Sequence, residues 1–173
     1  MRSLTLALGI ALTACGAAHP AGAAKPVDAP MLFTVDQLRA GCPQGRKIEL
    51  RIEMAGKPAV VEDWEFIKVD KVGATIHSVT HGEDGEPISE ETSTSKWTDL
   101  HQHAKFPAAT TTIDDKVELT IPAGTYTTRL YTVTDGATTK RFWFAVDLPG
   151  PPVQFSTETN GTLVMRAMMV RAK

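Results

Sequence analysis

Histidine side chains are the residues of this sequence whose chemistry could most readily build a site. Four of them fall within one stretch of the chain: His77, His81, His101 and His103. Cys42 could join them from elsewhere, and zinc requires three or four such ligands in a tetrahedral arrangement. His101 and His103 stand two positions apart on an expected helix, about 200° around its axis, so they could not face one ion. His77 and His81 lie four positions apart on an expected strand and turn, which permits a common side without requiring one, and we therefore predict no metal site.

Other kinds of catalytic or cofactor site are not indicated either. The chain has no Gly-x-Ser-x-Gly elbow, no paired Cys and His spacing and no glycine loop that would cradle a phosphate. The stretch 81–91 contains Glu83, Asp84 and Glu86, whose oxygens could bind calcium, but their spacing differs from that of known calcium loops. We expect this stretch to be a solvated loop or a hairpin tip. The sequence thus predicts a protein that is not an enzyme and that needs no cofactor.

The first fifteen residues, MRSLTLALGIALTAC, have the pattern of an export signal. A positive charge at Arg2 precedes an uncharged apolar stretch, residues 4–12. That stretch is well short of the roughly 20 apolar residues that span a bilayer, so it is typical of a signal-peptide core. It ends in the four residues LTAC, which closely resemble the lipobox of bacterial lipoproteins.

The lipobox resemblance implies a specific modification at Cys15. A diacylglyceryl group carrying acyl chains such as palmitate would join the thiol of Cys15, and a peptidase would remove residues 1–14. More than one chain is needed for stable anchoring, because burial contributes about 0.8 kcal/mol per CH₂ and a single chain holds only weakly. The alternative is an ordinary signal peptide that is cleaved further on, near residues 21–24 (AGAA), with Cys15 discarded.

The residues after the expected cleavage site predict where the domain would sit. Residues 15–30 are rich in Ala, Pro and Gly without apolar periodicity, so we expect a lipidated cysteine and a flexible tether. Gly16 is similar to the sorting signal of outer-membrane lipoproteins, which implies the outer membrane of the bacterial cell envelope, facing the periplasm. With Cys15 lipidated, Cys42 would have no disulfide partner, and we expect it to be a buried thiol.

Residues 31–173 have the patterns of one β-rich domain. Apolar and charged residues alternate strictly over 48–54, and Asp135-Gly136 and Asn160-Gly161 are strong signals for tight hairpin turns. Strands are expected at 48–54, 60–69, 71–80, 117–121, 126–134, 141–146, 153–158 and 162–172. The predicted fold class is mainly β with two short helices (α+β), a curved antiparallel sheet of about seven or eight strands that forms a half-barrel or a sandwich.

The two helices carry start and stop signals. Thr34 and Gln37 form a potential capping box for a helix over 35–40. Ser95 is the expected cap of the second helix, in which Trp97, Leu100, His101 and Ala104 follow the spacing of one buried face before Pro107.

Several segments resemble small β-rich domains of exported bacterial lipoproteins. These are AGTYTTRLYTV (123–133), RFWFAVDLPGPPV (141–153) and the internal helix SKWTDLHQHAKFP (95–107). The order of elements is also similar to the half-barrel of the LolA/LolB lipoprotein carriers. That similarity implies a curved antiparallel sheet with helices against its concave face, and it supplies no catalytic residue.

Aromatic residues are spread through the whole domain. They could form a core shared by the sheet and a helix, or they could surround a cavity for an acyl chain or another apolar ligand. Met165, Met168 and Met169 could adapt to such a cavity, because thioethers are flexible. The residues expected to line it are Trp64, Phe66, Trp97, Leu100, Phe142 and Phe144.

Composition narrows the choice of partners. With 42% hydrophobic residues, 22% charged residues and a net charge of −2, the chain has no electrostatic footprint for nucleic acid. The expected partners are the membrane, through the lipid on Cys15, and an apolar small molecule or an envelope protein. We therefore predict a membrane-anchored envelope lipoprotein with a non-enzymatic binding or structural domain. The alternatives are a carrier or sensor of lipid-like apolar molecules and, third, a metal-dependent enzyme.

Overall fold

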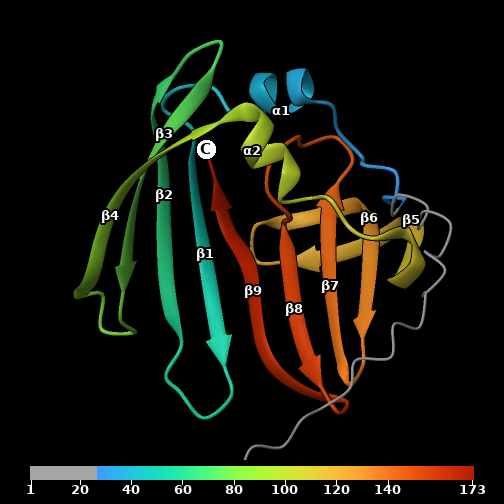
Figure 1. Ribbon diagram of the computed structural model, residues 1–173. Coiled ribbons are helices and arrows are strands. Elements are labelled where there is room, and N and C mark those ends of the chain that lie inside the picture. Colours follow the sequence, from blue (N-terminus) through green and yellow to red (C-terminus); the bar gives the residue numbers. More distant parts are fainter. Residues whose placement is uncertain (1–26) are drawn as a thin grey trace, which may run out of the picture.

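A computed structural model describes residues 27–173. They form one antiparallel sheet of nine strands in the order β4-β3-β2-β1-β9-β8-β7-β6-β5, with two short α-helices (Figure 1). The expected fold class is confirmed, with one more strand than the seven or eight predicted. The sheet is open, since β4 and β5 each pair on one side only. Residues 1–26, which include Cys15, the lipobox and most of the expected tether, lie outside the described residues.

The first half of the sheet contains the strand that the sequence pattern did not reveal. Its strands are β1 (Lys47–Met54), β2 (Val60–Val69), β3 (Gly73–His81) and β4 (Pro87–Lys96). The loop or hairpin tip predicted over 81–91 is the connection between β3 and β4 at residues 82–86. The prediction was wrong for His81 and from residue 87 onward, because β4 pairs with β3 from Gly73–Lys96 to His81–Pro87. Most of β4 is solvent-exposed, so its sequence shows no apolar alternation and backbone pairing alone marks it as a strand.

The second half consists of hairpins that follow the turn signals in the sequence. Its strands are β5 (Thr111–Ile121), β6 (Gly124–Asp135), β7 (Thr138–Ala145), β8 (Gln154–Thr159) and β9 (Thr162–Ala172). Asn160 and Gly161 take φ angles of 51° and 74°, as a tight hairpin turn requires. β5 begins earlier than expected because a bulge, with Lys116 at φ 61°, interrupts its alternation between Asp114 and Val117.

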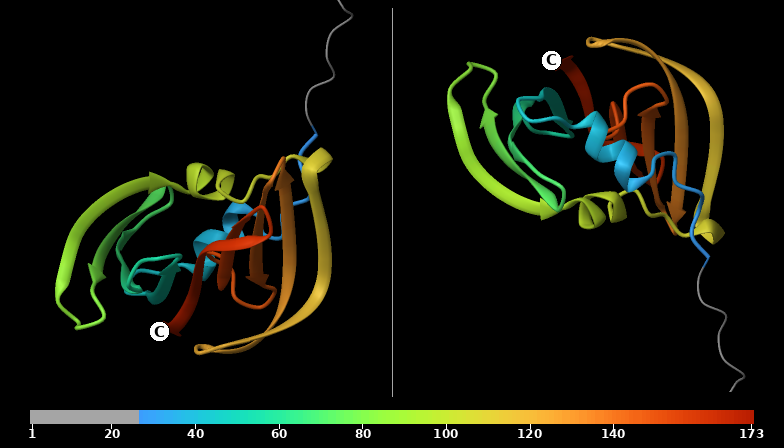
Figure 2. Two further views of the ribbon diagram at one scale, coloured as in Figure 1. Left: turned by 90° about the horizontal axis from the view of Figure 1, so that it is seen from below. Right: turned by 90° about the horizontal axis from the view of Figure 1, so that it is seen from above.

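Both helices lie at one end of the curved sheet. α1 (Val35–Gly41) starts at the predicted capping box: Gln37 N donates to Thr34 Oγ1 (3.2 Å), and Thr34 N donates to Gln37 Oε1 (2.9 Å). α2 (Trp97–Gln102) follows β4 directly, so Ser95 lies in a strand and is not its cap; Lys96 takes that position without a side-chain bond. Figure 2 shows the sheet curling around the helices, with α2 bridging from β4 towards the β5 side.

The N-terminal part of the described chain is attached to the sheet. Ala29 N donates to Phe106 O (2.8 Å), and the hydroxyl group of the buried Tyr131 donates to Pro30 O (2.8 Å). Residues 27–30, which the composition assigns to the tether, therefore pack on the domain, because backbone bonds and one buried tyrosine hold them there. No helix within residues 27–173 is long and apolar enough to cross a membrane.

Candidate functional site

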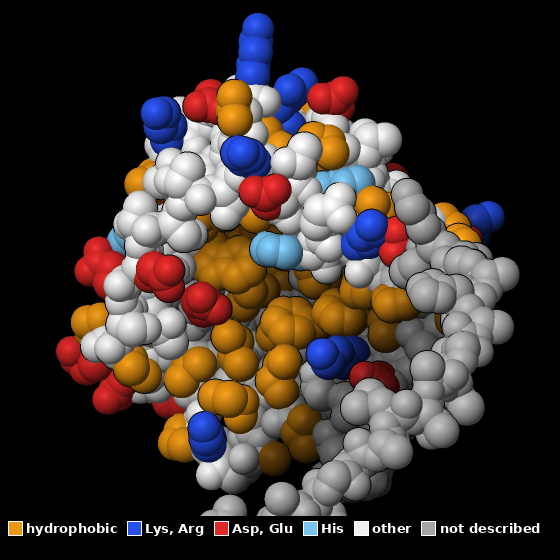
Figure 3. Space-filling view, viewed as in Figure 1, with side chains coloured by type: hydrophobic (Ala, Val, Ile, Leu, Met, Phe, Trp, Pro, Cys, Tyr) orange, Lys and Arg blue, Asp and Glu red, His pale blue; other side chains and the backbone are white. Residues whose placement is uncertain are grey.

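The concave face of the sheet holds a cavity of about 490 Å³ beneath the two helices. Figure 3 shows hydrophobic side chains gathered in a hollow on this face. Strands β2, β3, β4, β6, β7 and β8 and both helices contribute to its wall. All six residues predicted to line an apolar cavity lie in this wall: Trp64, Phe66, Trp97, Leu100, Phe142 and Phe144.

Strand register explains why these side chains meet. Residues paired across antiparallel neighbours point to the same face of the sheet. Phe142 pairs with Tyr131 on one side and with Phe155 on the other, so the three rings face the cavity together. Trp64 pairs with Ser78 in the same way on β2 and β3.

One side of the cavity is an aromatic wall built on β6, β7 and β8. The rings of Phe142 and Phe155 stack at 6.4 Å, and Tyr131 meets Phe144 edge-on at 5.7 Å. Phe106, buried behind this wall, stacks on Phe142 at 4.8 Å. Mutual packing fixes the rings in place, so this wall presents a rigid apolar surface.

The opposite side, built on β2, β3 and β4, mixes apolar and polar side chains. Trp64, Phe66 and Ile76 are its apolar part. Its polar part consists of two carboxylates and three serine hydroxyl groups: Glu62, Glu91, Ser78, Ser93 and Ser95. The cavity thus has an aromatic side and a mixed side that carries a few hydrogen-bonding groups, an arrangement typical of small-molecule sites in which a few polar groups orient the ligand.

The four histidines do not converge. His77 pairs with Glu90 (2.7 Å), and His81 Nε2 lies 3.2 Å from Asp63 Oδ2, both away from the cavity. His101 and His103 both lie in the cavity wall, and His101 Nε2 lies 2.8 Å from Phe33 O. Within residues 27–173 no three His, Cys, Asp or Glu side chains are grouped so as to hold a metal ion.

Cys42 also lies in the cavity wall, and it is 1% exposed. Burial raises the pKa of its thiol, and the nearby Arg46 guanidinium, with Nη1 3.4 Å from Sγ, offsets only part of that effect. Cys42 is therefore a neutral thiol at ordinary pH, as expected of a buried cysteine.

Arg46 is a buried charge that the sequence patterns did not single out. Its Nη1 donates to Gly41 O and to Pro149 O (2.8 Å), so it joins the end of α1 to the loop before β8. Nη2 has no hydrogen-bond partner in the described part of the chain. Arg46 precedes β1 in an irregular segment without periodicity, so nothing in the sequence marks it as buried.

Several residues of the cavity wall were not predicted from the sequence, although the sequence contains a signal for some of them. Tyr131 follows from the Asp135-Gly136 turn, because that hairpin pairs Asp135 with Thr138 and therefore Tyr131 with Phe142. The N-terminal segment 31–33, which also lines the cavity, has no such signal. Of the methionines considered, Met168 and Met169 are buried in the core, and none of the three lies in the cavity wall.

No protein-family model matches this chain, and no curated protein does. A crystal structure from Bacteroides fragilis, of a protein that is predicted to be exported and has a YmcC-like fold, is similar with a TM-score of 0.47 and 8% sequence identity. The match covers 76% of this chain and 96% of that one.

Proposed function

We propose that this protein is a non-enzymatic binding protein of the bacterial envelope, anchored through a lipid on Cys15, that holds an apolar or amphipathic small molecule in its concave cavity. The cavity carries the proposal: about 490 Å³ is within the range of about 300–1,000 Å³ found for small-molecule sites. A purely structural domain would gain stability by filling this space. The cavity therefore supports the carrier or sensor function, which the sequence left as an alternative.

The energetic reason for a ligand is the apolar wall. Transfer of apolar surface out of water contributes about 25 cal/mol per Å². An acyl chain or ring system seated against Phe142, Phe144 and Phe155 would bury both its own surface and theirs. The rings are already held by one another, so little ordering is needed on binding.

Binding can be tested with the fluorescent apolar probe N-phenyl-1-naphthylamine. The full chain carrying Cys15→Ala cannot receive the lipid, so it can be assayed without detergents that would compete for the cavity. In this background Ser93→Trp should weaken probe binding about tenfold, because the indole enters the cavity. Thr92→Trp is the matched control: Thr92 is the adjacent residue of β4 and faces the other side of the sheet, so its effect should stay within about twofold.

Two results would refute binding in this cavity. One is an absence of probe fluorescence enhancement with the parent protein. The other is equal weakening by Ser93→Trp and Thr92→Trp. In a separate experiment, native mass spectrometry of the same protein, released from cells without detergent, would identify any ligand that co-purifies.

The anchor has its own test, which does not depend on the cavity. Cells grown with an alkyne-tagged fatty acid should label the wild-type protein and the Cys42→Ala variant equally, and should leave Cys15→Ala unlabelled. Label on Cys15→Ala, or none on the wild type, would exclude the lipobox interpretation. In the labelled protein, Gly16→Asp should shift the distribution from the outer to the inner membrane on a density gradient, as the sorting resemblance implies.

A further inference from the structure

We infer that the ligand is an uncharged amphiphile with a hydroxyl-rich head group, as in a glycolipid, whose head lies against β2, β3 and β4 and whose apolar part lies against the aromatic wall. This inference rests on the proposed binding function and names the class of ligand. It follows from three features of the cavity: the placement of its polar groups, their lack of partners, and the sign of their charge.

Polar groups of β3 and β4 lie side by side on the concave face, next to Trp64 of β2. Ser78 pairs with Trp64 on β2 and with Glu91 on β4, so these three side chains stand in a row on the concave face. Ser93 lies two positions beyond Glu91 on the same face. A head group placed here could contact hydroxyl and carboxylate oxygens from neighbouring strands at the same time.

These polar side chains have no partners of their own. Within residues 27–173, none of Glu62, Ser78, Glu91, Ser93 and Ser95 makes a side-chain hydrogen bond or an ion pair. Their groups are therefore free to bind a ligand that supplies donors and acceptors.

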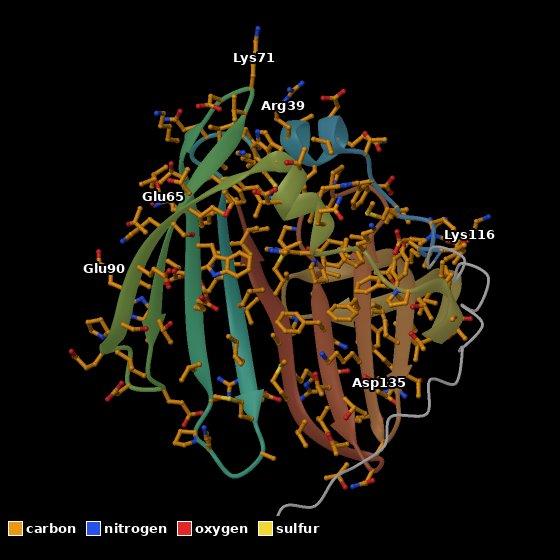
Figure 4. All side chains as sticks on the ribbon, viewed as in Figure 1. Arg39, Glu65, Lys71, Glu90, Lys116 and Asp135 are labelled. Carbon is orange, nitrogen blue, oxygen red and sulfur yellow. The ribbon has the colours of Figure 1, made fainter. Side chains whose placement is uncertain are left out.

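On the outer face of the same strands, several polar side chains do pair with one another. There Glu90 pairs with His77 (2.7 Å), Thr94 with Thr75 (3.0 Å between hydroxyl oxygens), and Glu65 with a lysine at the start of β1 (2.9 Å). Glu65 and Glu90 project away from the hollow (Figure 4). These three pairs of the outer face have no counterpart among the five polar residues of the concave wall.

Charge in the wall selects against an acidic head group. The described residues that form the wall include the carboxylates of Glu62 and Glu91 and no Lys or Arg. Arg129 pairs across the sheet with Phe144 and so shares its face, but its guanidinium lies 2.5 Å from the Asp115 carboxylate and outside the wall. A carboxylate or phosphate brought against β2 and β4 would meet the like charge of Glu62 and Glu91, while the imidazoles of the wall, His101 and His103, belong to the α2 segment.

Hydroxyl groups match this surface better than a cation does. A carboxylate only accepts hydrogen bonds, while a serine hydroxyl both donates and accepts. A sugar-like head can donate to Glu62 and Glu91 and also exchange hydrogen bonds with the serines. A quaternary ammonium group could pair with the carboxylates but would leave the serine hydroxyls without partners, at a cost wherever water is excluded.

The test compares ligands with three different heads and alkyl chains of nearly equal length. Dodecyl maltoside, tridecanoate and dodecanoate, and dodecyltrimethylammonium, each below its micelle concentration, are titrated against the bound naphthylamine probe on the full chain carrying Cys15→Ala. Tridecanoate carries the same dodecyl chain as the maltoside and the ammonium ligand, and dodecanoate is one carbon shorter. We expect dodecyl maltoside to displace the probe at about tenfold lower concentration than any charged ligand. Where the chain is the same, the differences report the head group alone.

Variants then locate the preference. Ser78→Ala with Ser93→Ala should weaken maltoside binding by about five- to tenfold and leave dodecanoate binding unchanged. Glu62→Gln with Glu91→Gln should strengthen dodecanoate binding by about fivefold or more, because the like charge is removed. Glu90→Gln, on the outer face of β4, is the matched control and should alter neither.

Each outcome decides a different point. Equal displacement by all of these ligands, or tighter binding of any charged one, would overturn the head-group inference while leaving the cavity function intact. Failure of the probe to bind at all would overturn the proposed function itself. A maltoside preference that persists in the double serine variant would also contradict the placement of the head on β3 and β4.

Discussion

Trp97 lies at the junction of β4 and α2, and its replacement by phenylalanine gives a quantitative test of the structure. The residue starts α2, is 2% exposed and lies in the cavity wall. Its indole Nε1 donates to Asp70 O (2.9 Å), and its backbone N–H donates to Val72 O (3.0 Å). Trp97→Phe removes the first of these bonds and part of the buried ring, while the backbone bond remains.

The expected cost is the sum of two effects. Loss of a hydrogen bond to a carbonyl group costs about 1 kcal/mol. The smaller ring leaves a gap, and since full truncation of a buried tryptophan costs about 3–5 kcal/mol, we assign about 1 kcal/mol to the partial loss. The total of about 2 kcal/mol corresponds to a fall in Tm of about 4–8 °C for a domain of this size.

Urea denaturation followed by far-ultraviolet circular dichroism measures this free energy of unfolding. Trp143→Phe is the control: Trp143 lies on the sheet, is partly buried where Trp97 is fully buried, and makes no side-chain hydrogen bond within the described residues. Trp97→Phe should be more destabilising than Trp143→Phe by about 1 kcal/mol at an unchanged m-value. Equal effects of the two substitutions would show that the bond to Asp70 O does not stabilise the junction of β4 and α2.

Three further substitutions test other parts of the fold. Gly41→Ala places a Cβ against the carbonyl oxygen of Pro149, so it should lower the free energy of unfolding by about 1–3 kcal/mol in urea denaturation. Hydrogen bonds, chiefly from Arg166, lower the pKa of Glu53; stability from this group is therefore present above about pH 4.3 and is lost as the pH falls further. Urea midpoints of wild type and Glu53→Gln should accordingly differ at pH 7 and converge at low pH, and a constant difference would contradict the ion pair. Tyr131→Phe should cost about 1 kcal/mol and speed hydrogen exchange in residues 27–30, which its hydroxyl group helps to hold; unchanged exchange there would show that the bond is dispensable.

Much of the fold could be predicted because its signals are local. The capping box of Thr34 and Gln37 acts within one turn, and the turn at Asn160-Gly161 depends on the φ angles of two residues. Strands such as β1 have one face on the core and the other towards solvent, so apolar and polar residues alternate in their sequence. These elements could be predicted because the interactions that form them involve residues close together in the sequence.

β4 and the start of β5 show where local signals fail. β4 is exposed at the edge of the sheet, so no burial pattern records its pairing with β3. In β5 the bulge at Lys116 shifts the alternation, and the pattern becomes readable only beyond it. In both strands, long-range backbone pairing fixes the structure.

In the candidate site, too, some features could be predicted from local sequence signals and others depended on the tertiary structure. The sequence by itself predicted several apolar residues that could line a cavity, because Trp97 and Leu100 share one face of a helix and Phe142 and Phe144, two positions apart, share one face of a strand. Whether those side chains fill a core or surround a space depends on how strongly the sheet curls and on where the helices rest. Only the tertiary structure decided that, because curvature arises from the register of nine strands together. The row of unpaired serines and carboxylates opposite the aromatic wall became visible at the same step, since strand pairing alone brings it together.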